Sequence, residues 1–200
     1  MNKTHLPIFA ISIAAILVGV VFTYGSFGNN SSSQTYEHGV MLGHIQLILT
    51  GSDGNVKQYV QTDNLIVDEG MDTMIDLMFP DTNLNGNSTD NKFKYIGIGT
   101  GNTGAAAGNI GEETLISGCN RIADGAVTGS SAISGESTGT VDAQFSGATC
   151  ASTTVREAVL TNSGTDAAAN AGELLARQTF TAINLGASDT LTVTWNITVT

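Results

Sequence analysis

The fold is indicated by residues 191–199, Leu-Thr-Val-Thr-Trp-Asn-Ile-Thr-Val, in which every second residue is apolar. Side chains of an extended chain point to opposite sides in turn, so this pattern predicts a β-strand with one buried and one solvated face. Residues 174–185 have a similar character, and residues 186–189 can turn the chain between the two segments. We therefore expect the chain to end in an antiparallel β-hairpin, with Trp195 in the core.

The part of the chain before this hairpin predicts further strands. They are expected at residues 40–50, 56–62, 65–67, 93–100, 119–127, 138–146 and 153–160. Only residues 69–79 change to a helical period, and Pro80 ends that helix. Short strands separated by turns of Gly, Asn, Asp and Ser predict a mainly β fold: an antiparallel, jelly-roll-like β-sandwich with one short helix inserted.

The start of the chain indicates the compartment. Residues 6–22 carry no charged side chain, and Lys3 precedes them. Such a segment is either a transmembrane anchor or a cleaved signal peptide, which we assign to residues 1–24. Residues 25–38 are a flexible, Ser- and Asn-rich linker, and residues 39–200 form the domain. We expect the domain to lie outside the cell, anchored to the membrane through residues 6–22; the alternative is secretion after signal cleavage.

Composition excludes some partners. The chain has 18 acidic and 7 basic residues, for a net charge of -11. Nucleic acid binding needs Lys and Arg to replace the counterions of the phosphates, so no nucleic acid partner is expected. The apolar fraction of 41% is too high for a disordered acidic tail.

Cys119 and Cys150 are an even pair in a chain expected to reach an oxidising space. A disulfide between them is the natural interpretation, and two free buried thiols are the alternative. They lack the neighbouring Cys or His residues that a zinc site needs.

One stretch resembles a calcium loop. Asp81, Asn83, Asn85 and Asn87 follow the alternate spacing with which side-chain oxygens surround Ca²⁺ in such loops. Lys92 stands at the twelfth position, where a bidentate Glu is needed. The loop is therefore either a calcium site or an ordinary polar surface loop, and no other cofactor is expected.

Glycosylation sequons begin at Asn29, Asn30, Asn87 and Asn196. Asn30, Asn87 and Asn196 would be acceptors on an exported chain in a host with the machinery. Asn196 lies on the expected polar face of the last strand.

No catalytic arrangement is expected. Residues 97–104 are rich in glycine but lack the register and the βαβ context of a nucleotide loop, so a strand running into a loose turn is predicted. Glu112 and Glu113 are expected to begin a short helical turn at residues 112–116 and to complement its dipole. Arg156 and Glu157 should point to opposite faces of a strand. Arg177 is expected on the polar face or paired with a carboxylate.

Several segments in order carry a family resemblance. They are residues 64–67, the helix at 69–79, Tyr-Ile-Gly-Ile-Gly-Thr-Gly-Asn-Thr at 95–103, Val-Arg-Glu-Ala-Val-Leu-Thr-Asn at 155–162, Leu-Leu-Ala-Arg-Gln-Thr-Phe at 174–180, and residues 189–197. Together they resemble the tail-fibre or appendage-type β domains of tailed bacteriophages, over residues 64–200. The resemblance implies a structural or attachment role without catalytic residues. The hydrophobic start and the expected disulfide depart from a tail component assembled in the cytoplasm.

The expected function is therefore that of a non-enzymatic structural or attachment protein of a cell surface or virus particle, which assembles with itself or with other surface proteins. The alternative is an exported carbohydrate- or calcium-binding surface module.

Overall fold

The computed structural model describes residues 40–78, 92–125, 127–130, 136–150, 153–165 and 172–200. The elements in chain order are β1 (Met41–Thr50), β2 (Val56–Ile66), α2 (Asp68–Met78), β3 (Tyr95–Gly99), β4 (Ile122–Ala123), β5 (Thr128–Ser130), β6 (Ser137–Ser146), β7 (Thr154–Thr161), β8 (Leu174–Asn184) and β9 (Thr190–Val199). The mainly β prediction is confirmed. Among these residues α2 is the one helix, and it lacks the length and apolar character to cross a bilayer.

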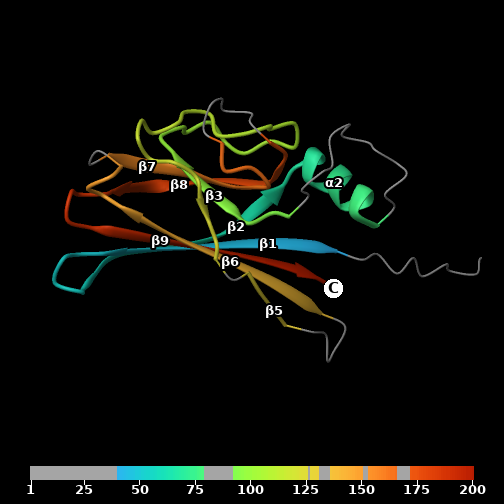
Figure 1. Cartoon of the computed structure of the whole chain (residues 1–200), viewed down its shortest axis with the longest axis horizontal. Coiled ribbons are helices and arrows are strands. Elements are labelled where there is room, and N and C mark those ends of the chain that lie inside the picture. The colour runs from blue at the N-terminus through green and yellow to red at the C-terminus, as the bar shows by residue number, and fades with distance from the viewer. Residues whose placement is uncertain (1–39, 79–91, 126, 131–135, 151–152, 166–171) are drawn as a thin grey trace, which may run out of the picture. The chain divides into compact units, whose positions relative to one another are not determined.

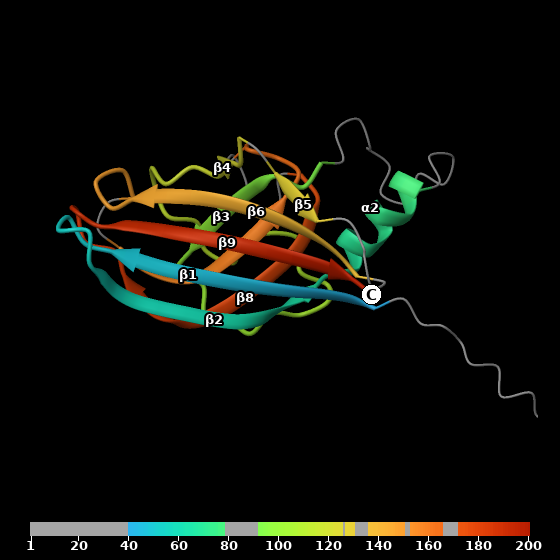
Figure 2. The same ribbon diagram turned by 90° about the horizontal axis from the view of Figure 1, so that it is seen from below.

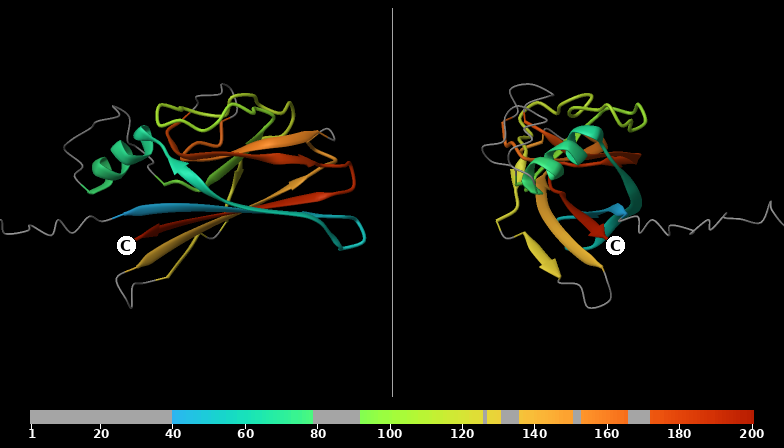
Figure 3. Two further views of the ribbon diagram at one scale, coloured as in Figure 1. Left: turned by 180° about the vertical axis from the view of Figure 1, so that it is seen from behind. Right: turned by 90° about the vertical axis from the view of Figure 1, so that its right-hand side faces the viewer.

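All the strands belong to one antiparallel sheet, in the order β4-β3-β7-β8-β2-β1-β9-β6-β5. The sheet is curled, so that β3, β7 and β8 form one layer and β1, β9 and β6 form the facing layer (Figure 1). Strand β2 belongs to both layers, because it pairs with β1 over most of its length and then with β8 only through Leu65 and Ile66. The views in Figures 2 and 3 show β2 passing from one layer toward the other.

The alternation in the last strand is confirmed from Leu191 to Trp195, where it builds the centre of the core; beyond them Ile197 is half-buried and Val199 is exposed. Leu191, Val193 and Trp195 are completely buried. Each lies between a buried residue of β1 and one of β6, so that Trp195 is flanked by Ile45 and Val141. The other two rows contain Leu47, Val193 and Ala143, and Leu49, Leu191 and Phe145. These rows pack against apolar side chains of the β3-β7-β8 layer in one cluster.

The predicted C-terminal hairpin is wrong. Strand β8 pairs with β7 and β2, whereas β9 pairs with β1 and β6. The turn itself forms, since the Asp189 N–H donates to the Gly186 carbonyl at 2.9 Å. It carries the chain from one layer to the other instead of folding β9 back beside β8. Alternation identifies a strand and its buried face but contains no information on its neighbour, which explains the error.

Helix α2 starts one residue before the predicted position, with Asp68 and Glu69 in its first turn. Gly70 allows the helix to approach β8 closely, because a Cβ there would lie 2.6 Å from the Leu175 carbonyl oxygen. Met74 packs against the core, whereas Met71 and Ile75 remain exposed. The predicted apolar face of this helix is therefore buried only in part.

The region before β6 differs from the prediction. Of the strand expected at residues 119–127 only the short β4 forms, and the short β5 follows it; the two lie at opposite ends of the sheet order. The apolar run at residues 65–67 is not a separate strand, since Leu65 and Ile66 complete β2. No helix forms at residues 112–116, where Leu115 instead makes an isolated bridge to Gly99.

The predicted disulfide is confirmed. Cys119 and Cys150 are bonded, buried and 4.5 Å apart at their Cα atoms. Cys119 precedes β4, at one end of the strand order, and Cys150 follows β6, near the other end. The bond therefore ties the two ends of the curled sheet together across its open side. Asp124 adds a second tie, because its carboxylate accepts the Asp142 N–H of β6 at 2.8 Å.

Candidate functional site

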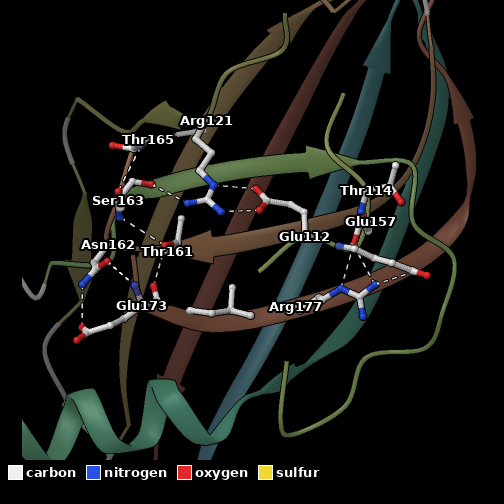
Figure 4. A network of polar contacts seen from close by, with 12 residues as sticks. Glu112, Thr114, Arg121, Glu157, Thr161, Asn162, Ser163, Thr165, Glu173 and Arg177 are labelled. Carbon is white, nitrogen blue, oxygen red and sulfur yellow. Dashed lines mark hydrogen bonds and ion pairs between the residues drawn. The ribbon is translucent and has the colours of Figure 1, made fainter. Parts of the chain in front are cut away.

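Among the described residues, a dense set of buried charges lies where residues 100–121 meet the β3-β7-β8 layer (Figure 4). We call it the carboxylate–arginine network; its members are Glu112, Glu113, Arg121, Glu157 and Arg177. Glu112, Arg121, Glu157 and Arg177 are all buried. Charges removed from water need partners at hydrogen-bond distance, so the contacts of each member decide what the network can do.

Glu157, which β7 contributes, is completely buried and accepts bonds on both carboxylate oxygens. Its Oε1 accepts the N–H groups of Gly101 at 3.0 Å and Thr114 at 2.9 Å. Its Oε2 accepts the Glu113 N–H at 3.0 Å and Nε of Arg177 at 2.9 Å. With these four donors in place, the carboxylate fastens residues 101–114 to the sheet.

Arg177 lies on β8 opposite Val159, diagonally across from Glu157, and the rest of its guanidinium also contacts the loop. One terminal nitrogen donates to Oδ1 of Asn109 at 3.1 Å, and the other lies 3.4 Å from Oε2 of Glu113. Glu113 in turn accepts the N–H of Thr103 at 2.8 Å and its hydroxyl at 2.6 Å. The Thr103 bonds, and to a smaller extent Arg177, hold the pKa of the Glu113 carboxyl below its ordinary value.

Glu112 and Arg121 form the second pair of the network. Nε of Arg121 donates to Oε1 of Glu112 at 2.8 Å, and a terminal nitrogen donates to Oε2 at 2.5 Å. This is the fork-to-fork geometry in which arginine binds a carboxylate most strongly. The remaining terminal nitrogen donates to the Ser163 carbonyl at 3.3 Å. The pair links the segment before β4 to the loop after β7.

The glycines at residues 97–101 make room for these carboxylates. A Cβ on Gly99 would lie 2.6 Å from the Thr114 carbonyl oxygen, and a Cβ on Gly101 would lie 2.5 Å from Oε1 of Glu157. A Cβ on Gly97 would overlap the Glu112 carboxylate. The Gly-Ile-Gly-Thr-Gly run is therefore explained by close approach of buried acids, within and just after strand β3.

A cavity of about 350 Å³ adjoins the network. Its lining includes Thr103, Gly108, Asn109, Glu113 and Arg177. The polar groups of Arg177 and Glu113 that border it are already bonded within the network. The arrangement therefore acts as a clamp on the loop, with no uncommitted acid–base pair at the cavity.

A second polar cluster joins α2 to β8. Oε2 of Glu69 accepts the Leu174 N–H at 2.9 Å. Oε2 of Glu173 accepts the Thr73 hydroxyl at 3.1 Å and the Asn162 amide at 2.8 Å. Burial raises the pKa of Glu69, and the charge of Glu173 acts in the same direction, against the lowering effect of the Leu174 N–H.

A third cluster lies at the turns of the β1–β2 hairpin and the β8–β9 connection. Nζ of Lys57 donates to Oδ1 of Asp189 at 2.7 Å. This contact is the main reason why the pKa of Asp189 lies below its ordinary value. In the first turn, the side chain and N–H of Asn55 donate to Asp53 and lower its pKa as well.

Two sequence predictions about charged residues are confirmed. Arg156 is exposed and Glu157 is buried, as expected for side chains on opposite faces of a strand. Arg177 is paired with a carboxylate, the second of the two expected alternatives. The prediction for Glu112 and Glu113 is wrong, because no helix begins there and both carboxylates bind arginines of the network. Tertiary pairing outweighs the local dipole argument at this position.

Some of the other predicted sites lie among the described residues and some do not. Asp81, Asn83, Asn85 and Asn87 of the predicted calcium loop lie outside the described residues, as does the sequon at Asn30. Asn196 lies on the polar face of β9 and accepts the Thr140 hydroxyl at 2.8 Å. In the described part of the chain, no group of three or more His, Cys, Asp or Glu side chains is arranged to hold a metal ion.

Sequence reasoning did not predict the network as a unit. A partial signal was available, because Arg177 follows a run of small and apolar residues within a strand, although Glu157 stands beside another charged residue, Arg156. A charged side chain in such a strand is solvated unless it has a partner, and it can be buried only in a pair. The strand order decides which carboxylate each arginine contacts, and the sequence pattern does not specify the strand order.

No family model, curated protein or solved structure matches this chain. Function is therefore inferred from the chemistry of its own residues.

Proposed function

We propose that this chain is a non-enzymatic structural or attachment protein of a cell surface or virus particle, exported and anchored to a membrane through residues 6–22. The observation that carries the proposal is that the buried carboxylates are bonded to main-chain N–H groups and arginines of the same chain. Glu157 accepts three main-chain N–H groups and an arginine, and Glu112 is held by Arg121 on both oxygens. Groups bonded in this way stabilise a loop and are not available to a substrate.

The Cys119–Cys150 disulfide supports export. Such bonds form and persist in oxidising spaces, and this one ties the ends of the sheet together where strand pairing does not close it. The finer assignments belong to the same proposal: a jelly-roll-like sandwich and kinship with phage appendage domains. The two facing layers and the antiparallel sheet support them.

The pairing of β9 argues against one mode of assembly. Strand addition to a free C-terminal strand would build a filament, but β9 pairs along its full length with β1 on one side and β6 on the other. Self-assembly would instead use another surface. The outer face of β9 and β6 is polar and internally bonded: Thr138 bonds Thr198 at 2.8 Å, and Thr194 donates to Asp142 at 2.5 Å.

Fractionation tests the proposal. Mass spectrometry of membrane, medium, particle and cytosol fractions would locate the chain and read its mature N-terminus. We expect it in the membrane or particle fraction, with residues 6–22 retained. Recovery in the cytosol with reduced cysteines would contradict the proposal.

The second candidate is an exported carbohydrate- or calcium-binding module. A polar groove between β2 and β8 favours the carbohydrate version. The calcium version depends on Asp81 and its neighbours. Calcium would raise the melting temperature of the wild-type chain and leave that of Asp81→Ala unchanged if this version holds.

A further inference from the structure

We propose that the groove between β2 and β8 binds an oligosaccharide that carries a carboxylate, with Arg156 as the group that recognises its charge. The groove is open to solvent and has a volume of about 640 Å³, which is within the range typical of ligand sites. This inference rests on the proposed attachment function and names the ligand class for it.

The groove arises where the curled sheet splits. Strands β2 and β8 pair only through Leu65–Arg177 and Ile66–Ala176, and beyond these pairs they separate into different layers. On the other side of β8, the ladder to β7 is irregular between the Val155–Ile183 and Glu157–Thr179 pairs. Arg156 lies within this irregular stretch and lines the groove from the β7 side.

Two glutamines bridge the split. The side chain of Gln58 donates to the Ala182 carbonyl at 3.2 Å, and that of Gln178 donates to the Thr62 hydroxyl at 3.4 Å. An added peptide strand would have to break both bridges to reach the strand edges. A ligand bound by side chains leaves them in place, so the groove suits a sugar better than a peptide.

The lining has the chemistry of a sugar site. Hydroxyls, amides and a guanidinium predominate, contributed by Gln61, Thr62, Asn102, Arg156, Thr179 and Thr181. Phe180 also lines the groove, where it packs against the apolar core. Polar groups of this kind satisfy the hydroxyls of a polyol, which an apolar pocket would leave unbonded.

Arg156 supplies the selectivity for charge. The other described arginines, Arg121 and Arg177, are buried in ion pairs, whereas Arg156 is exposed and makes no hydrogen bond or ion pair with a described residue. Its guanidinium is therefore available to a carboxylate, which it can bind through two parallel bonds.

The test uses the full chain in a zwitterionic, sugar-free detergent and two matched probes. Trigalacturonate carries a carboxylate at C6 of each ring, and galactotriose carries a hydroxyl there. Isothermal titration would measure the affinity of each probe for wild type, for Arg156→Gln and for the control variant Lys94→Gln. Lys94 does not line this groove, so its variant removes one positive charge elsewhere. The emission of Trp195 and the unfolding midpoint verify that each variant folds.

We expect trigalacturonate to bind wild type more tightly than galactotriose does. The Arg156→Gln substitution should weaken the affinity for trigalacturonate about tenfold to a hundredfold, and Lys94→Gln should change that affinity less than about twofold. No binding of trigalacturonate to folded wild type, equal binding of galactotriose, or equal losses in the two variants would overturn the inference. A surface-located chain that binds neither probe refutes the groove alone. A cytosolic chain refutes the attachment function whatever it binds.

Discussion

Arg177 on β8 donates Nε to Oε2 of Glu157 on β7 at 2.9 Å, and both side chains are almost completely removed from solvent. The two strands are neighbours, yet the pair serves a third element, because Glu157 also accepts the N–H groups of Gly101, Glu113 and Thr114. An ion pair that the sheet provides thus orders a long loop, and its removal should affect the stability of the fold.

Breaking this pair should be costly. Arg177→Met leaves Glu157 buried without its counterion, and we expect the free energy of unfolding to fall by about 3–5 kcal/mol. Urea unfolding followed by the fluorescence of Trp195, the one tryptophan in the chain, measures the change. Exposed Arg156→Gln is the control and should stay within about 0.5 kcal/mol of wild type. Similar losses in both variants would show that the pair has no special role.

The glycines beside the network should resist even a methyl group. Gly99→Ala places a Cβ 2.6 Å from the Thr114 carbonyl oxygen, so the loop or the carboxylate must shift, at a cost of about 1–3 kcal/mol. Gly104→Ala is the matched control, since a Cβ there meets no atom within 4 Å. Equal unfolding midpoints for the two variants would contradict this explanation of the Gly-Ile-Gly-Thr-Gly run.

The sequence predicts the features of the fold that depend on local pattern, and it does not predict those that depend on contacts between distant segments. Alternation correctly identified the buried face of residues 191–195 and the central place of Trp195, because burial imposes period two on a strand with one wet face. It could not show that β8 and β9 belong to different layers, nor that Glu112 meets Arg121. Both facts depend on contacts between segments distant in sequence, which local patterns do not specify.

The disulfide should stabilise the domain by about 3–4 kcal/mol, since it closes a loop between residues 31 apart in sequence. The double variant Cys119→Ala/Cys150→Ala is expected to unfold at correspondingly lower urea. Adding a reductant should shift the wild type toward the double variant and leave the variant itself unchanged. A wild type insensitive to reductant, with the bond shown to be reduced, would disprove the stabilising role.

The carboxyl groups of Asp189 and Glu69 should make the stability of the fold depend on pH with opposite signs. The pKa of Asp189 is lowered by Lys57, so its contribution to stability is present above the ordinary value of 3.8 and is lost as the pH falls through the lower folded value. The pKa of Glu69 is raised from 4.5, so its contribution is present below that value and is lost as the pH rises through the higher folded value.

Unfolding measured between pH 2 and 7 separates the two groups. Relative to wild type, Asp189→Asn should lose stability at neutral pH and approach wild type in acid. Glu69→Gln should gain relative to wild type as the pH rises, because its neutral amide can still accept the Leu174 N–H. Parallel curves for the two variants would contradict the assignment.

Exposure of the domain on intact cells or particles tests the central claim most directly. A membrane-impermeant amine reagent, applied before lysis and read by peptide mass spectrometry, should label the exposed side chains of Lys57 and Lys92, and non-reduced digests should contain the Cys119–Cys150 linked peptide. Labelling of these lysines only after lysis, with both cysteines recovered as free thiols, would contradict a surface role.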